Sequence, residues 1–345
     1  LRVVNALGVE TYLTSVVGSE MPHHWPLAAL KAQAVAARTY ALRQRSRGGG
    51  WDVKASVASQ VYRGVEAETA STRQAVAETR SLVLVHRGKL INAVFHSSSG
   101  GVTESSGMVW SQQLPYLVSV PDHDQHSPVH RWQERFASSG LRQRLPETGG
   151  VNRVDVTSRS ASGRVRQARL EGPRGSLVLT GRELRQRLGL KSTLVTFEMV
   201  SADSAKPFQA STVLARRSAS STGSRSRIDR ITASVARSTT TSSLPSTSFL
   251  VAPPPPPVLS SPMRSRSFRF RASRSNARRG PAVGGLQLLV RGQGYGHGVG
   301  MSQWGAHGLA EQGADFRAIL GHYYRGADVL PFKSHYDPAL AWQPH

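Results

Sequence analysis

Residues 18–40 read GSEMPHHWPLAALKAQAVAARTY, and this stretch predicts two helices that meet at an acidic elbow. Pro26 suits the first turn of the second helix, which we expect to end near residues 47–48. Apolar residues recur along that helix at helical spacing: Leu27, Leu30, Ala34, Ala37 and Ala41. The same spacing predicts a shorter helix upstream, over residues 9–17: Val9, Leu13 and Val16. Glu20 therefore lies between the two helices, just before Met21 and Pro22.

Glu20 is the candidate catalytic group of this stretch. Its neighbours Val16, Val17 and Met21 are apolar, and such surroundings raise the pKa of a carboxyl and keep a proton on it. A general acid needs that proton. On the local sequence alone, a surface or helix-capping glutamate is the commoner alternative, because perturbed carboxylates are a minority of all carboxylates.

A second motif, GQGYGHGVGMSQWGAHG, occupies residues 292–308. Glycine at every second position from 292 to 300 predicts a loop that can fold tightly around sugar rings. The spacing matches neither a dinucleotide fingerprint nor a phosphate loop, and it misses the nucleophile elbow of hydrolases by one residue. We expect His297 to hydrogen-bond substrate or Glu20, or else to tie glycine carbonyls together. Tyr295, Trp304 and Tyr40 are candidates for stacking on pyranose rings, with core packing as the alternative.

A long basic segment separates the two motifs. The chain has 345 residues and a formal net charge of +23. Residues 203–280 are rich in Ser, Thr and Arg, and their 14 Lys and Arg against two Asp give a net +12. Few apolar residues recur there at a regular period, so we expect disorder. We therefore predict one domain formed by residues 1–202 and 285–331, with a disordered basic insertion at 203–284 and a C-terminal tail at 332–345.

Helices and strands alternate irregularly between the motifs. We expect a helix over residues 66–79, a strand over 82–85, a turn at Arg87-Gly88 and a second strand over 90–95. Shorter elements are predicted further along: strands over 154–157 and 164–170, and a helix over 181–188. The predicted fold class is α+β, a single mixed domain.

Several blocks of the chain, in order, resemble the stage II sporulation protein D family, whose members are also described as amidase-enhancer-like. The blocks carrying this resemblance are residues 8–13, 19–22, 29–40, 95–101, 115–117, 296–303 and 319–324. Together they extend through nearly all of residues 1–200 and 286–331. The resemblance implies a lytic transglycosylase that acts on peptidoglycan.

This resemblance also implies a mechanism and a set of site residues. Glu20 would protonate the glycosidic oxygen between N-acetylmuramic acid and N-acetylglucosamine, and its carboxylate would then deprotonate the muramic 6-hydroxyl. The product ends would be 1,6-anhydromuramic acid, and the preferred substrate would be glycan stripped of its stem peptides. We expect the following residues to bind substrate or support the site: Lys31, Gln33, Arg38, Tyr40, His96, Ser97, Ser98, Tyr295, His297, Ser302 and Gln303.

Two other classes of function stay open. A noncatalytic wall-binding module could enhance a separate cell-wall amidase, as the family's enhancer label implies. The basic insertion could also bind an anionic wall polymer, an acidic membrane surface or nucleic acid. We favour the wall or membrane over nucleic acid, and a solvated linker with no partner is the plain alternative. The expected partners are thus peptidoglycan glycan strands and, as a candidate, a cell-wall amidase.

We expect no metal and no other cofactor. Four residues near position 126 form the densest cluster of candidate ligands: His123, Asp124, His126 and His130. Pro121 and Pro128 place this cluster in a loop rather than on a helix. Some relatives in the resembling family carry zinc bound through a cysteine of the loop after His96, and here Ser99 takes that place. A serine hydroxyl is a poor zinc ligand.

No targeting segment is visible in the given sequence. It contains no cysteine and no run of about 20 apolar residues that would span a bilayer. Residues 1–20 lack the basic and then apolar layout of a signal peptide, and residue 1 is already in domain-like sequence. We therefore expect upstream residues to be missing and infer an extracytoplasmic location, in the cell wall or periplasm, from the substrate.

Overall fold

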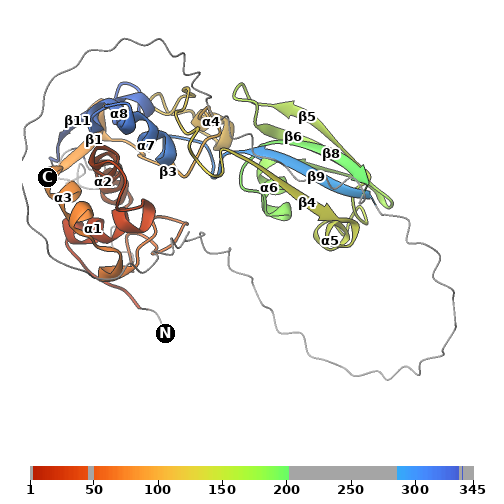
Figure 1. Cartoon of the computed structure of the whole chain (residues 1–345), viewed down its shortest axis with the longest axis horizontal. Coiled ribbons are helices and arrows are strands. Elements are labelled where there is room, and N and C mark those ends of the chain that lie inside the picture. The colour runs from red at the N-terminus through yellow and green to blue at the C-terminus, as the bar shows by residue number, and fades with distance from the viewer. Residues whose placement is uncertain (1–2, 46–49, 202–285, 334–335, 337–345) are drawn as a thin grey trace, which may run out of the picture. The chain divides into compact units, whose positions relative to one another are not determined.

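A computed structural model describes residues 3–45, 50–201, 286–333 and 336. It contains helices and antiparallel sheets in mixed order, which confirms the predicted α+β class (Figure 1). The described residues belong to one compact unit. No helix in this part of the chain is both long enough and apolar enough to cross a membrane.

Helices from both ends of the chain share one core. These helices are α1 (Val9–Glu20), α2 (Leu27–Gln44), α3 (Ala70–Glu78), α7 (Gln303–Glu311) and α8 (Phe316–Tyr323). The alanine-rich helix α2 lies at the centre and contacts the other four. Its residues from Ala29 to Ala37 are buried except Lys31, because small side chains let neighbouring helices approach closely on several sides. The predicted helix pair is thus confirmed.

The predicted helix over residues 66–79 is split in two. A 3-10 turn, η1 (Gly64–Ala67), comes first, and Thr69 then caps α3 by accepting a hydrogen bond from the Thr72 backbone N–H. Thr69 itself has an extended backbone, so α3 begins at the next residue, Ala70.

Short strands surround the helical core. Strand β1 (Leu82–His86) pairs with β11 (Asp328–Pro331) and with β2 (Lys89–Leu90). The predicted second strand over residues 90–95 is wrong, because β2 ends at Leu90 and the chain then turns away. Strand β3 (Phe95–His96) instead pairs in parallel with β10 (Met301–Ser302). This pairing brings the serine-rich loop after His96 beside the glycine-rich motif.

A second core lies among strands of the middle region. One sheet has the order β4 (Arg131–Ala137), β9 (Leu286–Gln293), β8 (Leu194–Ser201), and another has the order β5 (Arg153–Arg159), β6 (Val165–Gly172), β7 (Gly175–Thr180). Helices α5 (Ser138–Arg144) and α6 (Gly181–Leu188) contact these strands. The predicted helix over 181–188 is confirmed, as are strands at the two predicted positions. Apolar side chains between these elements, such as Leu141, Leu170, Leu184 and Leu288, form the core.

The long insertion begins and ends at one place in this sheet. Ser201, the last residue of β8, pairs with Leu286, the first residue of β9. Two strand ends that are neighbours in a sheet can be joined by a connection of almost any length, because longer loops cost little extra closure entropy. The expected disorder of residues 203–284 lies outside the described residues, as does most of the expected tail at 332–345.

Candidate active site

Glu20 is held by partners from two distant segments of the chain. Its Oε1 accepts a hydrogen bond from the Val61 backbone N–H at 2.8 Å, and its Oε2 accepts one from Nε2 of Gln303 at 3.0 Å. The side chain is half-buried, and both partners are amides. These two hydrogen bonds fix the orientation of the carboxyl group, and no ion pair to it is found among the described residues.

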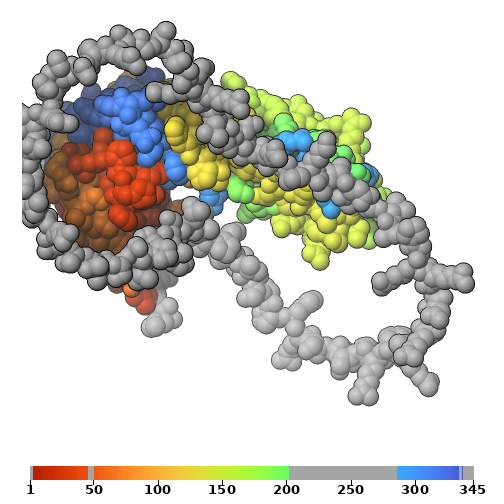
Figure 2. Space-filling view, in the orientation of Figure 1, coloured from red at the N-terminus to blue at the C-terminus, as the bar shows by residue number. Residues whose placement is uncertain are grey.

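Local structure explains why these three residues meet. Glu20 is the last residue of α1, where the chain leaves the helix at Met21 with an extended backbone. Ser302 caps α7 by accepting a hydrogen bond from Gly305 N–H, so Gln303 begins that helix. The surface of the N-terminal helices borders that of the C-terminal segment, red beside blue in Figure 2. Gln303 was predicted as a substrate-binding residue, and its amide orients the candidate acid.

The pKa of Glu20 is raised from its ordinary value. Burial is the largest cause, because it disfavours the charged form of a carboxyl. The hydrogen bonds from Val61 and Gln303 and the positive charge of Arg63 oppose this effect without cancelling it. The electrostatic environment thus agrees with the expectation drawn from Val16, Val17 and Met21.

Sequence reasoning missed a tyrosine cluster beside Glu20. Burial raises the pKa of Tyr12, and charge interactions with Glu20, Tyr40 and Tyr62 raise it further. Tyr12 donates its hydroxyl proton to Oε1 of Gln60 at 3.0 Å, and its ring stacks on Tyr62 with centroids 5.5 Å apart. Tyr12 lies eight residues before Glu20 on α1, a spacing that places both on one helix face and offered a sequence signal.

An aromatic cluster lies next to Gln303. The rings of Trp25 and Trp304 are 4.7 Å apart, and His307 lies 4.7 Å from Trp25 and 5.6 Å from Trp304. Trp25 is buried, whereas Trp304 is half-exposed. Trp304 therefore retains a surface on which a sugar ring can stack, and its predicted binding role stays a prediction.

Four of the predicted site residues bond to other parts of the protein. Arg38 is 1% exposed, pairs with both carboxylate oxygens of Glu10, and donates to the carbonyl of Leu82. Ser98 donates to Asp124 at 2.5 Å, Ser302 caps α7, and Lys31 pairs with Glu78. Three of the four, Arg38, Ser98 and Ser302, have almost no exposed surface, so a substrate cannot reach them in this conformation.

Gln33 and His96 are also buried, and each has side-chain atoms without a hydrogen-bond partner among the described residues. Gln33 has no exposed surface, and neither its amide nitrogen nor its amide oxygen has a partner among the described residues. Nδ1 of His96 donates a hydrogen bond to the Val299 carbonyl at 3.1 Å, and its Nε2 lacks a partner in the same part of the chain. Four further predicted residues are half-exposed, and their contacts with substrate stay predictions: Tyr40, Ser97, Tyr295 and His297.

The glycine-rich loop packs against protein rather than around an open space. Four of its glycines have positive φ: Gly294, Gly296, Gly298 and Gly300. A Cβ on Gly298 would meet the Arg164 guanidinium, and one on Gly300 would meet the Val94 carbonyl. The expectation that these glycines make room for sugar rings is therefore wrong, because neighbouring protein atoms fill that room. Two half-exposed side chains lie between these glycines and face solvent in part: Tyr295 and His297.

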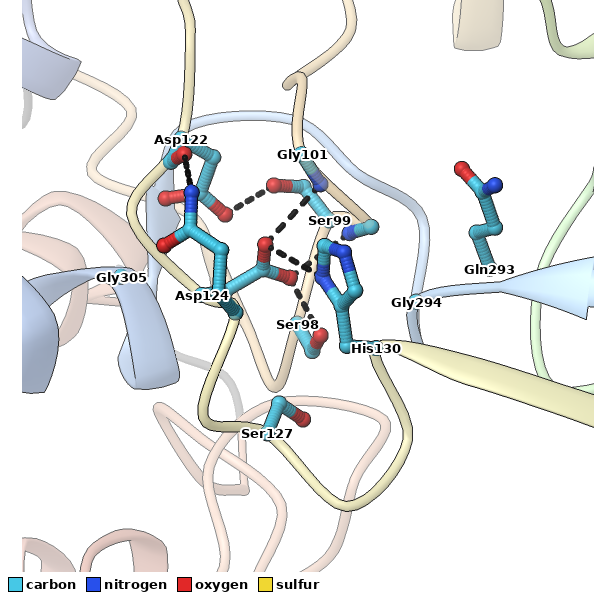
Figure 3. Close-up of polar contacts among 12 residues, drawn as sticks. Ser98, Ser99, Gly101, Asp122, Asp124, Ser127, His130, Gln293, Gly294 and Gly305 are labelled. Carbon is cyan, nitrogen blue, oxygen red and sulfur yellow. Dashed lines mark hydrogen bonds and ion pairs between the residues drawn. The ribbon is translucent and has the colours of Figure 1, made fainter. Parts of the chain in front are cut away.

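A buried polar network fixes the serine loop that follows β3 (Figure 3). Asp124 accepts hydrogen bonds from Ser98, from the N–H groups of Gly100 and Gly101, and from Nδ1 of His130 at 3.0 Å. The predicted ligand cluster thus lies in a loop, as expected, with Asp124 turned toward the serine loop. Burial raises the pKa of Asp124, but the hydrogen bonds from His130, Ser98 and Gly100 outweigh it and hold this pKa at about 2.

Zinc does not fit at Ser99, the position that the family resemblance singles out for a zinc ligand. Ser99 donates its hydroxyl proton to Oδ2 of Asp122, whose Oδ1 accepts a second bond from the Tyr323 hydroxyl at 2.6 Å. The hydroxyl and the carboxylate thus satisfy each other, and neither is left as a free ligand. In the described ranges, no group of three His, Cys, Asp or Glu side chains is arranged to hold a metal ion.

Comparison with known proteins agrees with this arrangement. A family model described as "Stage II sporulation protein" matches residues 1–86. The chain is 30% identical over 328 residues to the amidase enhancer of Bacillus subtilis, an alignment that covers 93% of this chain and 40% of that protein. It is 27% identical over 347 residues to stage II sporulation protein D of Bacillus amyloliquefaciens, covering 94% and 75% of the two chains. An uncharacterized protein of Brachyspira hyodysenteriae is 28% identical over 333 residues, covering 96% and 68%.

The fold and the site define a mixed α+β protein built around one glutamate at a helix elbow. The chain belongs to the stage II sporulation protein D family, which confirms the resemblance found in its sequence. It spans less than half the length of the B. subtilis amidase enhancer and three quarters of the length of the B. amyloliquefaciens protein.

Proposed function

We propose that this protein is a peptidoglycan lytic transglycosylase that cleaves the bond between N-acetylmuramic acid and N-acetylglucosamine. Its substrate is glycan stripped of stem peptides, and its site of action is extracytoplasmic, in the cell wall or periplasm. Membership of the stage II sporulation protein D family supports a role at the cell wall. The environment of Glu20 supports the chemistry.

The observation that carries the proposal is a half-buried carboxyl group that accepts hydrogen bonds from two amide partners. A glycosidase that uses water needs an acid and a second carboxylate. Glu20 instead bonds to the Val61 N–H and the Gln303 amide, and burial raises its pKa. A single carboxyl can suffice when the sugar's own hydroxyl replaces water as the nucleophile.

The two steps use Glu20 first as an acid and then as a base. The protonated carboxyl donates its proton to the glycosidic oxygen as the bond to the anomeric carbon breaks. The resulting carboxylate, stabilised by the Gln303 and Val61 hydrogen bonds, takes the proton of the muramic 6-hydroxyl as that oxygen bonds to the anomeric carbon. The carboxyl is regenerated, and the product ends are 1,6-anhydromuramic acid with no water consumed.

Product analysis in heavy-oxygen water tests this reaction. Purified strands with and without stem peptides are incubated with the protein, and new ends are identified by mass spectrometry. The proposal predicts anhydro ends without heavy oxygen, formed faster on stripped strands. Reducing ends that carry heavy oxygen would show hydrolysis and contradict the proposed mechanism.

A second candidate is a noncatalytic wall-binding module that enhances a separate cell-wall amidase. The 30% identity to the B. subtilis amidase enhancer favours it. In that case the protein would bind strands, leave every glycosidic bond intact and raise the rate at which an added amidase releases stem peptides. The same strand preparations distinguish the two candidates, because only the first yields new glycan ends.

A further inference from the structure

Arg185 of α6 is a half-buried cation without an anionic partner. Its Nε donates to the Leu190 carbonyl at 3.2 Å, and no carboxylate in the described part of the chain pairs with it. Burial lowers the pKa of Arg185, and the side chain that opposes this effect is Tyr295 rather than a carboxylate. A partly desolvated charge is costly unless something compensates it. This guanidinium is therefore suited to accept an anion from outside the chain.

Two other cations near the glycine-rich loop, Lys191 and Arg164, have acidic side chains beside them. Lys191 pairs with Glu134 at 2.5 Å. Arg164 is buried and donates hydrogen bonds to the carbonyls of Ser99 and Val102. Three acidic side chains favour its charged form: Glu104, Asp122 and Asp124. The contrast marks Arg185 as the cation available for a ligand at this loop.

The segment that follows Arg185 contacts the glycine-rich loop, and the charge of Arg185 acts on two aromatic side chains of that loop. The Gly296 N–H donates to the Lys191 carbonyl at 3.0 Å, which joins the loop to the segment after α6. The charge of Arg185 acts on Tyr295 and on His297, whose pKa is lowered to about 4, chiefly by burial. His297 is therefore neutral at pH 7 and adds no competing positive charge. The half-exposed Trp110 ring lies 5.3 Å from His297.

A short path of hydrogen bonds connects this aromatic and cationic patch, formed by Trp110, Arg185, Tyr295 and His297, to Glu20. Ser98 and Tyr295 exchange two backbone hydrogen bonds, of 3.1 and 2.6 Å. The neighbouring Ser97 carbonyl accepts from the Trp304 N–H at 3.0 Å, and Trp304 follows Gln303, the partner of Glu20. These contacts tie the patch and the partner of Glu20 to one continuous part of the fold.

We propose that Arg185 binds a carboxylate of the glycan strand, in a subsite where Tyr295, His297 and Trp110 contact the sugar. Guanidinium and carboxylate groups form paired, charge-assisted hydrogen bonds, and aromatic faces suit pyranose rings. This subsite rests on the proposed function. The carboxylate is the lactyl group of muramic acid, which is free on stripped strands and is an amide when a stem peptide is attached. Arg185 thereby gives a physical reason for selecting stripped glycan.

Binding to a protein that cannot cleave tests this subsite separately from catalysis. The Glu20→Gln protein serves as the parent, and its affinity is measured for stripped strands, peptide-bearing strands and stripped strands whose lactyl carboxyls are capped as methylamides. We expect Arg185→Gln to weaken binding to stripped strands about tenfold and to leave binding to capped strands unchanged. Arg185→Lys should retain part of the affinity. Arg182→Gln, an exposed arginine on the same helix, is the matched control and should change nothing.

Several outcomes would overturn the subsite. One is an Arg185→Gln variant that binds stripped strands as tightly as its parent, and another is a parent that binds no strand. Equal losses on stripped and capped strands would assign Arg185 a structural role, which melting temperatures of the Gln and Lys variants would reveal. Tighter, Arg185-dependent binding of peptide-bearing strands would place the carboxylate in the stem peptide and refute the lactyl assignment. Failure of the unmutated protein to form anhydro ends would refute the transglycosylase alone, because the binding assay does not require cleavage.

Discussion

Gln303 donates a hydrogen bond to Glu20 over 3.0 Å although 283 residues separate them in the chain. Gln303 is buried, with 7% of the residue exposed, so water does not readily replace its amide at Glu20. A donor of this kind stabilises the carboxylate form of Glu20 while burial favours the protonated form. The balance between these two effects sets the pH at which Glu20 changes from acid to base.

Removing this donor should change the pH dependence of the reaction. Gln303→Leu deletes a hydrogen bond to the charged form, so the pKa of Glu20 rises further. We expect the basic limb of the pH profile for anhydro-end formation to move to higher pH by about one unit. Gln186→Leu, the same change at an exposed position on α6, is the control. A basic limb that stays in place or moves to lower pH would contradict the role given to Gln303.

Arg38 should contribute to stability far more than Lys31. Arg38 is buried against Glu10 and backbone carbonyls, whereas the ion pair between Lys31 and Glu78 is partly exposed. Breaking a buried pair leaves an uncompensated charge, so Arg38→Met should lower the free energy of unfolding by about 3 kcal/mol. Lys31→Met should cost about 1 kcal/mol or less. Urea denaturation measures both, and equal losses would refute the scaffold role of Arg38.

Asp124 should make the fold sensitive to acid. Its pKa in the folded protein is about 2, below the ordinary value of about 3.9 for Asp. A lowered pKa means stability that is present above the ordinary value and is lost as the pH falls through the folded value. Asp124→Asn should therefore be less stable than the parent at pH 7, with the gap in melting temperature closing between about pH 4 and pH 2.

Asp155→Asn is the control for this acid sensitivity. Asp155 lies on β5 and pairs with Arg153, whose side chain is 68% exposed. Its substitution should produce only a small gap in melting temperature at pH 7, because an exposed ion pair contributes little to stability. A gap for Asp124→Asn that stays constant from pH 7 to pH 2 would show that the network contributes through packing alone.

Chelators should leave this protein unchanged. The Ser99 hydroxyl and the Asp122 carboxylate bond to each other, so zinc has no free ligand there. We expect the melting temperature to be the same with and without EDTA, and Ser99→Ala to lower it equally in both conditions. A melting temperature that EDTA lowers and zinc restores would contradict this account.

Local patterns in the sequence were sufficient for the helical core and for the apolar surroundings of Glu20, whereas its choice as the candidate acid also needed the family resemblance. The spacing of Leu27, Leu30 and Ala34 predicts α2, and the apolar neighbours of Glu20 predict its raised pKa. Both signals act within a few residues, where periodicity and burial are directly linked. The helix at 181–188 was equally accessible, because Thr180 and Glu183 form a capping box and Gly189 ends the helix with a left-handed backbone.

Contacts between residues far apart in the chain could not be predicted from local sequence patterns. Arg38 is a charged residue in an otherwise apolar helix, which suggests a binding role. No neighbouring residue in the sequence indicates that Arg38 bonds to Glu10 and to the Leu82 carbonyl. The alternating glycines likewise suggest open space, although Arg164, more than a hundred residues away, fills it. The parallel pairing of β3 with β10 depends on strand partners that no local pattern specifies.

The central claim is that Glu20 performs both proton transfers of a transglycosylase. The most direct measurement is mass spectrometry of stripped glycan strands after incubation with the unmutated protein and, in parallel, with Glu20→Gln, alongside an assay of strand binding. We predict anhydromuramic ends from the unmutated protein, none from Glu20→Gln, and binding by both. Anhydro ends produced equally by Glu20→Gln, or strands left intact by both proteins, would contradict the claim.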